Sequence, residues 1–204
     1  MVSRTGGIAT AALGLPAYLM QGRVLDSDVL SAVGSEPAHT LLRELGILVS
    51  VDNDMYFKAL GFSQSSEGRS GTVTLFNAPR GVMPGSATVC EGVVYRGASG
   101  FAGVLDMLPF GLDTQSVVEM LGSPVTAQPY LAFVMRSLIA SMNPGRFIIT
   151  GSLVDAEAVG SLEASVAKTV PTWAMPEFVY RPSFERWYLD GLVSWLQQGA
   201  GVGA

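Results

Sequence analysis

The fold of this chain is constrained most by short apolar runs in which apolar and polar residues do not alternate. Such runs lie at Gly7–Leu15, Gly46–Val51 and Arg146–Thr150. A strand with one face in water alternates between apolar and polar residues, whereas a strand covered on both faces does not. The three runs therefore predict buried strands in a parallel or mixed sheet.

The pattern changes between residues 71 and 95, where short strand-like segments are separated by turn residues. We expect strands at Thr72–Phe76, Ser86–Val89 and Val93–Tyr95, with Glu91-Gly92 as the tight turn between the last two. Because the connections are this short, neighbouring strands must run in opposite directions. The segment is predicted to be an antiparallel meander.

The second half of the chain is mainly helical, because its apolar residues recur at spacings of three and four. Asp155 is expected to cap one helix, Pro129 to lie in the first turn of another, and Asn143-Pro144-Gly145 to end that helix. Together with the strands, these helices predict a mixed α/β layer architecture. The expected elements are helices at Thr114–Leu121, Pro129–Met142, Asp155–Thr169 and Ser183–Gln197, and a further strand at Phe178–Tyr180.

Composition narrows the function classes. The 204 residues are 49% hydrophobic and 14% charged, which suits a sizeable core and excludes a disordered tail or a coiled coil. Twelve basic residues stand against 17 acidic ones, with no run of Lys or Arg, so we expect no direct contact with nucleic acid. The single cysteine, Cys90, excludes an internal disulfide and is expected to be buried and unreactive.

The apolar stretch Gly7–Met20 is interrupted by Gly14 and Pro16 and is shorter than the roughly 20 residues that a membrane span needs. We therefore expect no membrane association and a cytoplasmic protein. The only histidine, His39, has no neighbouring cluster of ligand residues and is expected at a surface or at a helix start.

One candidate site follows the predicted strand that ends at Val51. Asp52-Asn53-Asp54 lies at the carboxyl end of that strand, where open α/β sheets place their ligand crevices. A carboxylate there can accept a proton from a substrate hydroxyl while the asparagine orients the substrate. The alternative is that Asn53 or Asp54 caps the helix beginning near Met55, and the tripeptide alone leaves both open.

Two glycine-bearing segments are the other candidates. In the connection between Asn77 and Ser86, Gly81 and Gly85 would let backbone N–H groups approach an anion, although a plain hairpin loop fits the same residues. Further on, glycines recur three residues apart, which indicates a close backbone approach or a sharp bend. These are Gly97, Gly100 and Gly103.

Taken in their order along the chain, these candidate segments resemble one family, the ROK proteins, named for repressor, open reading frame and kinase. The resemblance covers roughly residues 7 to 198 and implies an α/β, actin-like ATPase (ribonuclease-H-like) fold with two lobes of mixed sheets flanked by helices. Residues 53–182 would form the C-terminal lobe, and 1–52 plus 183–204 an incomplete N-terminal lobe. The matching motifs are Val51–Asp54, Gly81–Gly85, Arg96–Met107 and Asn143–Ser152.

By this resemblance a sugar would bind between the lobes and, in the kinases, ATP beside it. Asp54 would be the catalytic base for attack on the γ-phosphate. In this chain we expect it to be a vestigial base, which no longer serves catalysis. The resemblance assigns substrate binding to Asn53, Asp54 and Gly97, the phosphates to Gly81 and Gly85, and the adenosine side to Gly151 and Ser152.

This chain departs from the family pattern at several positions. Val104 stands where the family has its sugar-binding Glu, and Asp106-Met107 where it has Gly-His with a zinc-ligating histidine. Met83 and Pro84 interrupt the phosphate hairpin, and the opening Asp-x-Gly-Gly-Thr motif is missing. Phosphoryl transfer depends on positioning the phosphates and neutralising their charge. We therefore expect no zinc site, no bound ATP or Mg²⁺ and no kinase activity.

The leading hypothesis is a non-catalytic sugar-sensing or oligomerisation domain of a ROK transcriptional regulator, without a DNA-binding region of its own. Its expected partners are a sugar effector and further copies of the chain, as in a dimer. The alternative is a fragment of a ROK sugar kinase that phosphorylates a hexose or N-acetylhexosamine with Asp54 as base. An unliganded scaffold is a third possibility.

Overall fold

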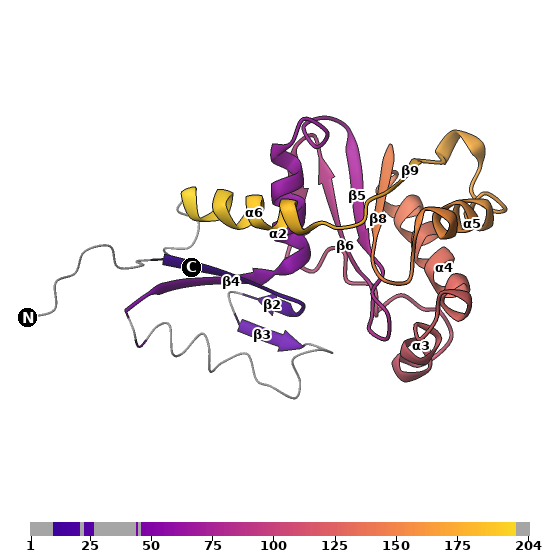
Figure 1. Ribbon diagram of the computed structural model, residues 1–204, viewed down its shortest axis with the longest axis horizontal. Coiled ribbons are helices and arrows are strands. Elements are labelled where there is room, and N and C mark those ends of the chain that lie inside the picture. The colour runs from indigo at the N-terminus through magenta and orange to yellow at the C-terminus, as the bar shows by residue number, and fades with distance from the viewer. Residues whose placement is uncertain (1–9, 21–22, 27–43, 45, 199–204) are drawn as a thin grey trace, which may run out of the picture.

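A mixed five-stranded sheet is the centre of the molecule. The computed structural model describes residues 10–20, 23–26, 44 and 46–198 (Figure 1). The sheet has the order β7-β6-β5-β8-β9; β5 to β7 form an antiparallel meander, while β8 runs parallel to both β5 and β9. The predicted meander and the predicted mixed sheet are confirmed. The strands are β5 (Thr72–Asn77), β6 (Gly85–Cys90), β7 (Val93–Tyr95), β8 (Arg146–Thr150) and β9 (Glu177–Tyr180).

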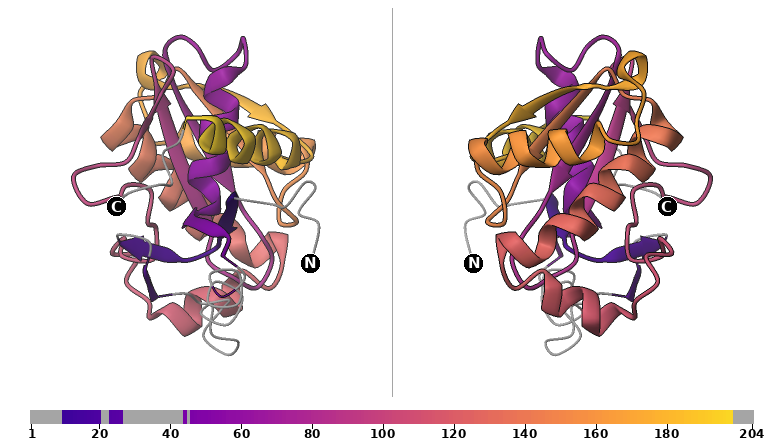
Figure 2. Two further views of the ribbon diagram at one scale, coloured as in Figure 1. Left: turned by 90° about the vertical axis from the view of Figure 1, so that its left-hand side faces the viewer. Right: turned by 90° about the vertical axis from the view of Figure 1, so that its right-hand side faces the viewer.

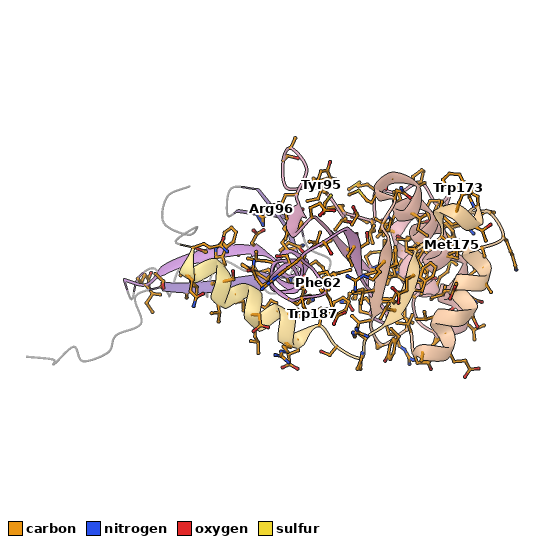
Figure 3. The ribbon with its side chains drawn as sticks, turned by 90° about the horizontal axis from the view of Figure 1, so that it is seen from above. Phe62, Tyr95, Arg96, Trp173, Met175 and Trp187 are labelled. Atoms are coloured by element: carbon orange, nitrogen blue, oxygen red, sulfur yellow. The ribbon has the colours of Figure 1, made fainter. Side chains whose placement is uncertain are left out.

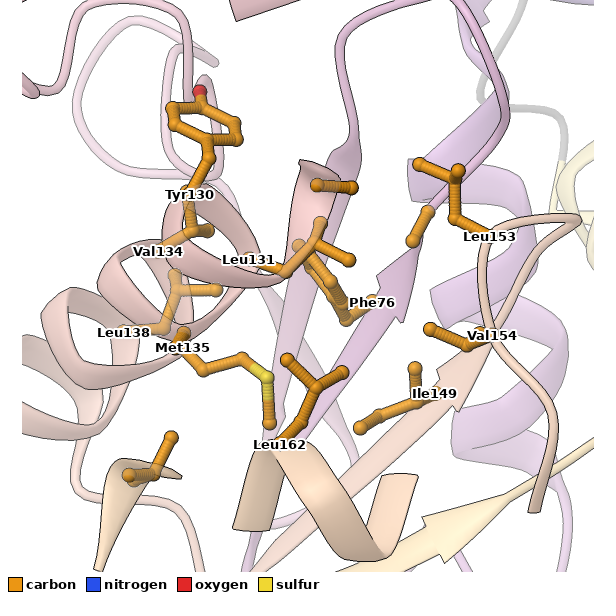
Figure 4. Packing of buried hydrophobic residues seen from close by; sticks show 14 of the residues in the cluster. Phe76, Tyr130, Leu131, Val134, Met135, Leu138, Ile149, Leu153, Val154 and Leu162 are labelled. Atoms are coloured by element: carbon orange, nitrogen blue, oxygen red, sulfur yellow. The ribbon is translucent and has the colours of Figure 1, made fainter. Parts of the chain in front are cut away.

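Helices cover both faces of this sheet (Figures 1 and 2). The helices α4 (Pro124–Met142) and α5 (Ala156–Val166) pack on one face, and α2 (Asp54–Gln64) packs on the other, with α6 (Glu185–Gln197) beside it. Because successive strand residues point to opposite faces, β8 sends Phe147 and Ile149 toward α4 and α5, and Ile148 toward α2. Figure 4 shows the apolar cluster between the sheet and the helices α4 and α5, in which Ile149 lies beside side chains from both helices.

Local capping residues explain where most helices begin and end. Asp155 caps α5 by accepting the N–H of Ala158 at 2.8 Å, and Asn143 ends α4 in the left-handed conformation, as predicted. The prediction that Pro129 lies in the first turn of its helix is wrong. Ser123 caps α4 through the N–H of Thr126, so the helix starts five residues earlier, at Pro124. Pro129 lies inside it.

A second, smaller layer consists of β1 (Thr10–Leu15) paired in parallel with β4 (Leu48–Asn53), next to the hairpin of β2 (Tyr18–Met20) and β3 (Arg23–Asp26). The expectation of buried strands at Gly7–Leu15 and Gly46–Val51 is wrong, because the described side chains of β1 and β4 are half-buried or exposed. Burial of a strand on both faces requires packed layers on both, and among the described residues this two-stranded sheet meets helices mainly in α2 and α6. Residues 7–9 of the predicted strand and His39 lie outside the described residues.

The two layers are joined where α2 crosses α6. A Cβ atom on Gly61 would lie 1.8 Å from the carbonyl oxygen of Trp187, and one on Gly191 would lie 1.9 Å from that of Phe57. Only glycine lets the two backbones approach this closely. Aromatic packing continues the contact, with ring centroids of Phe62 and Trp187 4.9 Å apart (Figure 3). On its other side α6 reaches β1.

The exposure of Cys90 corrects another expectation. Its thiol is exposed rather than buried, because the residue ends β6 at the turn before β7, where Sγ lies 3.5 Å from Oγ1 of Thr72. In the described part of the chain, no helix combines the length and the apolar character needed to cross a lipid bilayer.

Candidate functional site

Asn53 lies at the junction of β4 and α2, and its side chain is held at both ends. Its Oδ1 accepts the N–H of Met55 at 2.8 Å, which caps α2, and its Nδ2 donates to the carbonyl oxygen of Ala17 at 2.8 Å. The structure thus bears out the capping alternative for Asn53. The sugar-binding role of Asn53 stays a prediction.

Asp54 is the first residue of α2 and forms an ion pair with Lys58, four residues further along the helix. The distance from Oδ2 of Asp54 to Nζ of Lys58 is 2.5 Å, and the two side chains are 23% and 15% exposed. Both residues line a cavity of about 610 Å³ between β1, α6 and the end of β8. Lys58 was not predicted from the sequence, although opposite charges four residues apart on a helix are a local signal for such a pair.

Two other predicted residues share this cavity. Gly151 and Ser152, which follow β8, line it together with Asp54. The glycine has a structural reason to be present, because it has a φ of +122° and a Cβ atom there would lie 2.2 Å from the carbonyl oxygen of Ala78. Thus the structure brings the candidate base and the two predicted adenosine-side positions into one space.

The loop from Ala78 to Pro84, which joins β5 to β6, has most of its backbone donors engaged. Prolines at 79 and 84 provide no N–H, which leaves five such groups in the seven residues. Three of these five donate within the protein at 2.8–2.9 Å. They are Ala78 to the carbonyl of Thr150, Arg80 to Oγ of Ser152, and Gly81 to the carbonyl of Leu121.

The two predicted phosphate glycines do not line the cavity of Asp54. Gly81 lies in the loop with a φ of +72° and open space around it. Gly85 is the first residue of β6, opposite Asn77, and a Cβ atom there would lie 3.0 Å from Cγ of Met55. The geometry of this segment is therefore that of a plain hairpin, which was the alternative interpretation to an anion-binding loop.

Gly97 lines a different cavity, of about 360 Å³, between the glycine-rich loop of residues 97–105 and α4. Two side chains also hold this loop: Ser86 Oγ donates to the carbonyl of Gly103 at 3.1 Å, and the Tyr56 hydroxyl contacts the carbonyls of Gly100 and Ala102. Of the predicted substrate-binding residues, Asp54 and Gly97 therefore line separate cavities, and Asn53 lines neither of these two.

A charged and aromatic cluster around Arg96 was not predicted from the sequence. Arg96 forms an ion pair with Asp52, and its guanidinium carbon lies 4.5 Å from the ring centroid of Tyr56 and 5.5 Å from that of Trp195. Asp52 also accepts the N–H of Asn53 at 2.8 Å. No local pattern predicts a pair 44 residues apart in the chain, although each partner belongs to a motif already singled out.

Burial dominates the electrostatics of this cluster. Burial raises the pKa of Asp52 above its ordinary value, although the charge of Arg96 opposes the shift. Burial also raises the pKa of Tyr56 to about 12. In the described ranges, no three His, Cys, Asp or Glu side chains lie close enough together to hold a metal ion. Met107, which stands where the family has its zinc-ligating histidine, is 65% exposed.

No protein-family model matches the sequence, and no curated protein matches it either. Solved structures do match. The ROK hexokinase from Thermus thermophilus has a TM-score of 0.63 and 16% identity, over 96% of this chain and 81% of that one. A ROK family glucokinase from Streptomyces griseus, in complex with glucose and AMPPNP, has a TM-score of 0.65 and 13% identity, over 93% and 82%.

A ROK family transcriptional regulator, described as a homologue of the E. coli MLC protein, also matches. Its TM-score is 0.64 at 16% identity, over 91% of this chain and 64% of that one. The chain therefore has the α/β, actin-like ATPase fold of ROK sugar kinases and of a ROK regulator, which confirms the predicted fold class. The resemblance seen in the sequence motifs extends to the three-dimensional fold.

Proposed function

We propose that this chain is a degenerate ROK domain that senses a sugar or mediates oligomerisation within a transcriptional regulator, without catalysing phosphoryl transfer. The observation that carries the proposal is the engaged backbone of the loop from Ala78 to Pro84. Two prolines have no donor, and three of the five remaining N–H groups donate inside the protein. Phosphates that approached this loop would meet few free donors.

This loss matters because phosphoryl transfer asks a protein mainly to position the phosphates and neutralise their charge. A loop that cradles phosphate does so with several backbone N–H groups directed at the anion. Here those of Arg80 and Gly81 donate to Ser152 and Leu121 instead. The backbone donors present in this loop do not fit the phosphates of a nucleoside triphosphate.

The ion pair between Asp54 and Lys58 supports the same proposal. A general base must present a free lone pair within hydrogen-bond reach of the hydroxyl that it deprotonates. One carboxylate oxygen of Asp54 is held by the Lys58 ammonium at 2.5 Å. Asn53, which would orient a sugar by resemblance, has both side-chain atoms bonded to the backbone.

Sensing is supported by where the 610 Å³ cavity lies. Gly14 of the small layer, Tyr188 of α6 and Ser152 beside the five-stranded sheet all line it, so a ligand there would touch both layers. Hydroxyl, amide and carboxylate groups in the lining suit the hydroxyls of a sugar. A ligand that contacts both layers better in one arrangement would favour that arrangement. The contact between two copies of the chain would then change with the arrangement of the layers.

The kinase alternative rests on a specific observation. Asp54, Gly151 and Ser152, which stand at the base and adenosine-side positions by resemblance, line one cavity. If a hexose or N-acetylhexosamine hydroxyl displaced Lys58, the carboxylate of Asp54 would accept its proton. The solved glucokinase with glucose and AMPPNP shows that this fold can hold both kinds of ligand.

The two proposals are separated by mixing the chain with MgATP and a panel of hexoses and N-acetylhexosamines. We expect one sugar at millimolar concentration to raise the melting temperature, with no sugar phosphate seen by ³¹P NMR. Asp190→Asn, which changes an exposed acid on α6, is the matched control for Asp54→Asn. Sugar phosphate that disappears in Asp54→Asn but persists in the control would establish the kinase. No melting shift with any sugar would reject sensing.

A further inference from the structure

A third cavity, of about 280 Å³, lies on the far side of α2 from Asp54. It is bounded by α2, the end of α6 and β7, and it shares no lining residue with the cavity of Asp54. Arg96, which follows Tyr95 at the end of β7 (Figure 3), is one of its lining residues. The proposed function makes no use of this space.

The walls of this cavity are apolar and aromatic, and its rim is open to water. Phe57 and Tyr56 are 1% and 7% exposed and form buried parts of the lining. Gln64 and Gln198 are exposed and lie at the rim. A ring system would therefore lie against carbon atoms, while one edge of it stayed near water.

Arg96 is the one charged residue in the described lining. Its Nη2 is paired with Asp52, but a guanidinium has five N–H donors and can serve two carboxylates at once. The Arg96 side chain is 37% exposed, so ligands in solution can reach it. A cation set among aromatic rings favours a planar anion.

Trp195 adds a second, independent signal. Its indole ring lines the cavity and lies under the Arg96 guanidinium, 5.5 Å from it. Its Nε1 is buried and has no hydrogen-bond partner among the described residues. Buried donors without a partner are rare in folded proteins, and an acceptor brought by a ligand would satisfy this one.

We propose that this cavity binds a small aromatic carboxylate, with one carboxylate oxygen on Arg96, the other accepting from the indole N–H of Trp195, and the ring system against the apolar lining. A cavity of about 150 Å³ in another protein holds one benzene molecule. A volume of about 280 Å³ therefore suits two fused rings. The site is independent of the sugar proposal, since neither the ligand nor the residues overlap.

The test uses 2-naphthoate as the probe and 2-naphthalenemethanol as its uncharged counterpart. Indole N–H signals of the whole chain are followed by NMR, and Trp195→Phe assigns the signal of Trp195. We expect 2-naphthoate to move that signal in a saturable way. The alcohol should bind at least about tenfold more weakly, since a hydrogen bond to a charged group is lost.

Arg96→Gln should weaken 2-naphthoate at least about tenfold, because it removes the cation. Arg186→Gln is the matched control, since Arg186 is 93% exposed on α6, and its affinity should equal that of the unchanged chain. Equal binding of acid and alcohol, an unchanged affinity in Arg96→Gln, or no saturable shift would each overturn the proposal. The comparison of acid with alcohol decides the matter even if Arg96→Gln does not fold.

Discussion

The five-stranded sheet and the β1–β4 layer differ in how they are stabilised. Residues such as Phe147 and Ile148 of β8 are completely buried, between helices that cover both faces of their sheet. Leu13 of β1 is only half-buried, and its two-stranded layer meets the rest of the molecule mainly through α2 and α6. The first region thus has a core of its own, whereas the second depends on a crossing of two helices.

This difference explains how the fold can keep its shape while its site changes. The large clusters on both faces of the five-stranded sheet contain none of the site residues predicted from the sequence, although Tyr56 and Phe184 of the second cluster border the site. Substitutions of residues such as Asp54 and Lys58 should therefore cost little packing. The account predicts that stability and site chemistry can be altered separately.

The largest expected effect contrasts the two regions directly. Phe147→Ala should lower the free energy of unfolding by about 3–5 kcal/mol, because a fully buried ring leaves a cavity. Leu13→Ala should cost about 1–2 kcal/mol, since its side chain is half in water. Urea unfolding followed by circular dichroism measures both. Equal losses would remove the proposed difference between the regions.

Breaking the crossing of α2 and α6 should have the next largest effect. Gly61→Leu places side-chain atoms where the backbone of Trp187 lies, and overpacking of this kind costs about 1–3 kcal/mol. Hydrogen exchange should rise first in α6 and β1, while β5 and β8 stay protected. Gly160→Ala on α5 is the control, since a Cβ atom there has open space. Uniform loss of protection across all strands would argue against a dependent second layer.

Capping of α5 offers a smaller, local effect within the first region. Asp155→Ala removes the acceptor for the N–H of Ala158 and should cost about 1 kcal/mol. Asp155→Asn keeps a capping oxygen and should cost much less. Differential scanning calorimetry compares the two variants. A loss in Asp155→Asn as large as in Asp155→Ala would show that capping is not the reason.

The last effect is a pH dependence, which concerns the link between α2 and the glycine-rich loop. Burial raises the pKa of Tyr56 to about 12, whereas an unfolded phenol titrates near about 10. Between these values the unfolded chain loses a proton that the folded chain keeps, so the free energy of unfolding falls as pH rises above about 10. Tyr56→Phe should lessen this fall. Identical pH profiles from urea unfolding would contradict the assigned burial.

The sequence predicted the elements whose signals are local. Asp155 lies one residue before its helix, and the turn at Glu91-Gly92 lies between strands that pair with each other, so neighbouring residues were enough. The start of α4 was missed because Pro129 is a strong helix-start signal, yet Ser123 and Pro124 provide the same signal earlier. Exposure of Cys90 depends on its place at the end of a strand, which a hydropathy pattern does not give.

The site was predicted less completely because its geometry is tertiary. The motifs located Asp54, Gly151 and Ser152, which do share a cavity. Gly97 was grouped with them by its motif, but the loop that carries it turns toward α4. The contact of Arg96 with Asp52 joins residues 44 apart, and nothing in either local sequence indicates such a pair.

The central claim is that the body of a sugar kinase fold persists here without a site for nucleotide phosphates. Isothermal titration of the whole chain with MgAMPPNP, in the presence of each sugar of the panel, tests it most directly. The account predicts no heat of binding from the nucleotide at millimolar concentration. Saturable binding of one nucleotide per chain would contradict it.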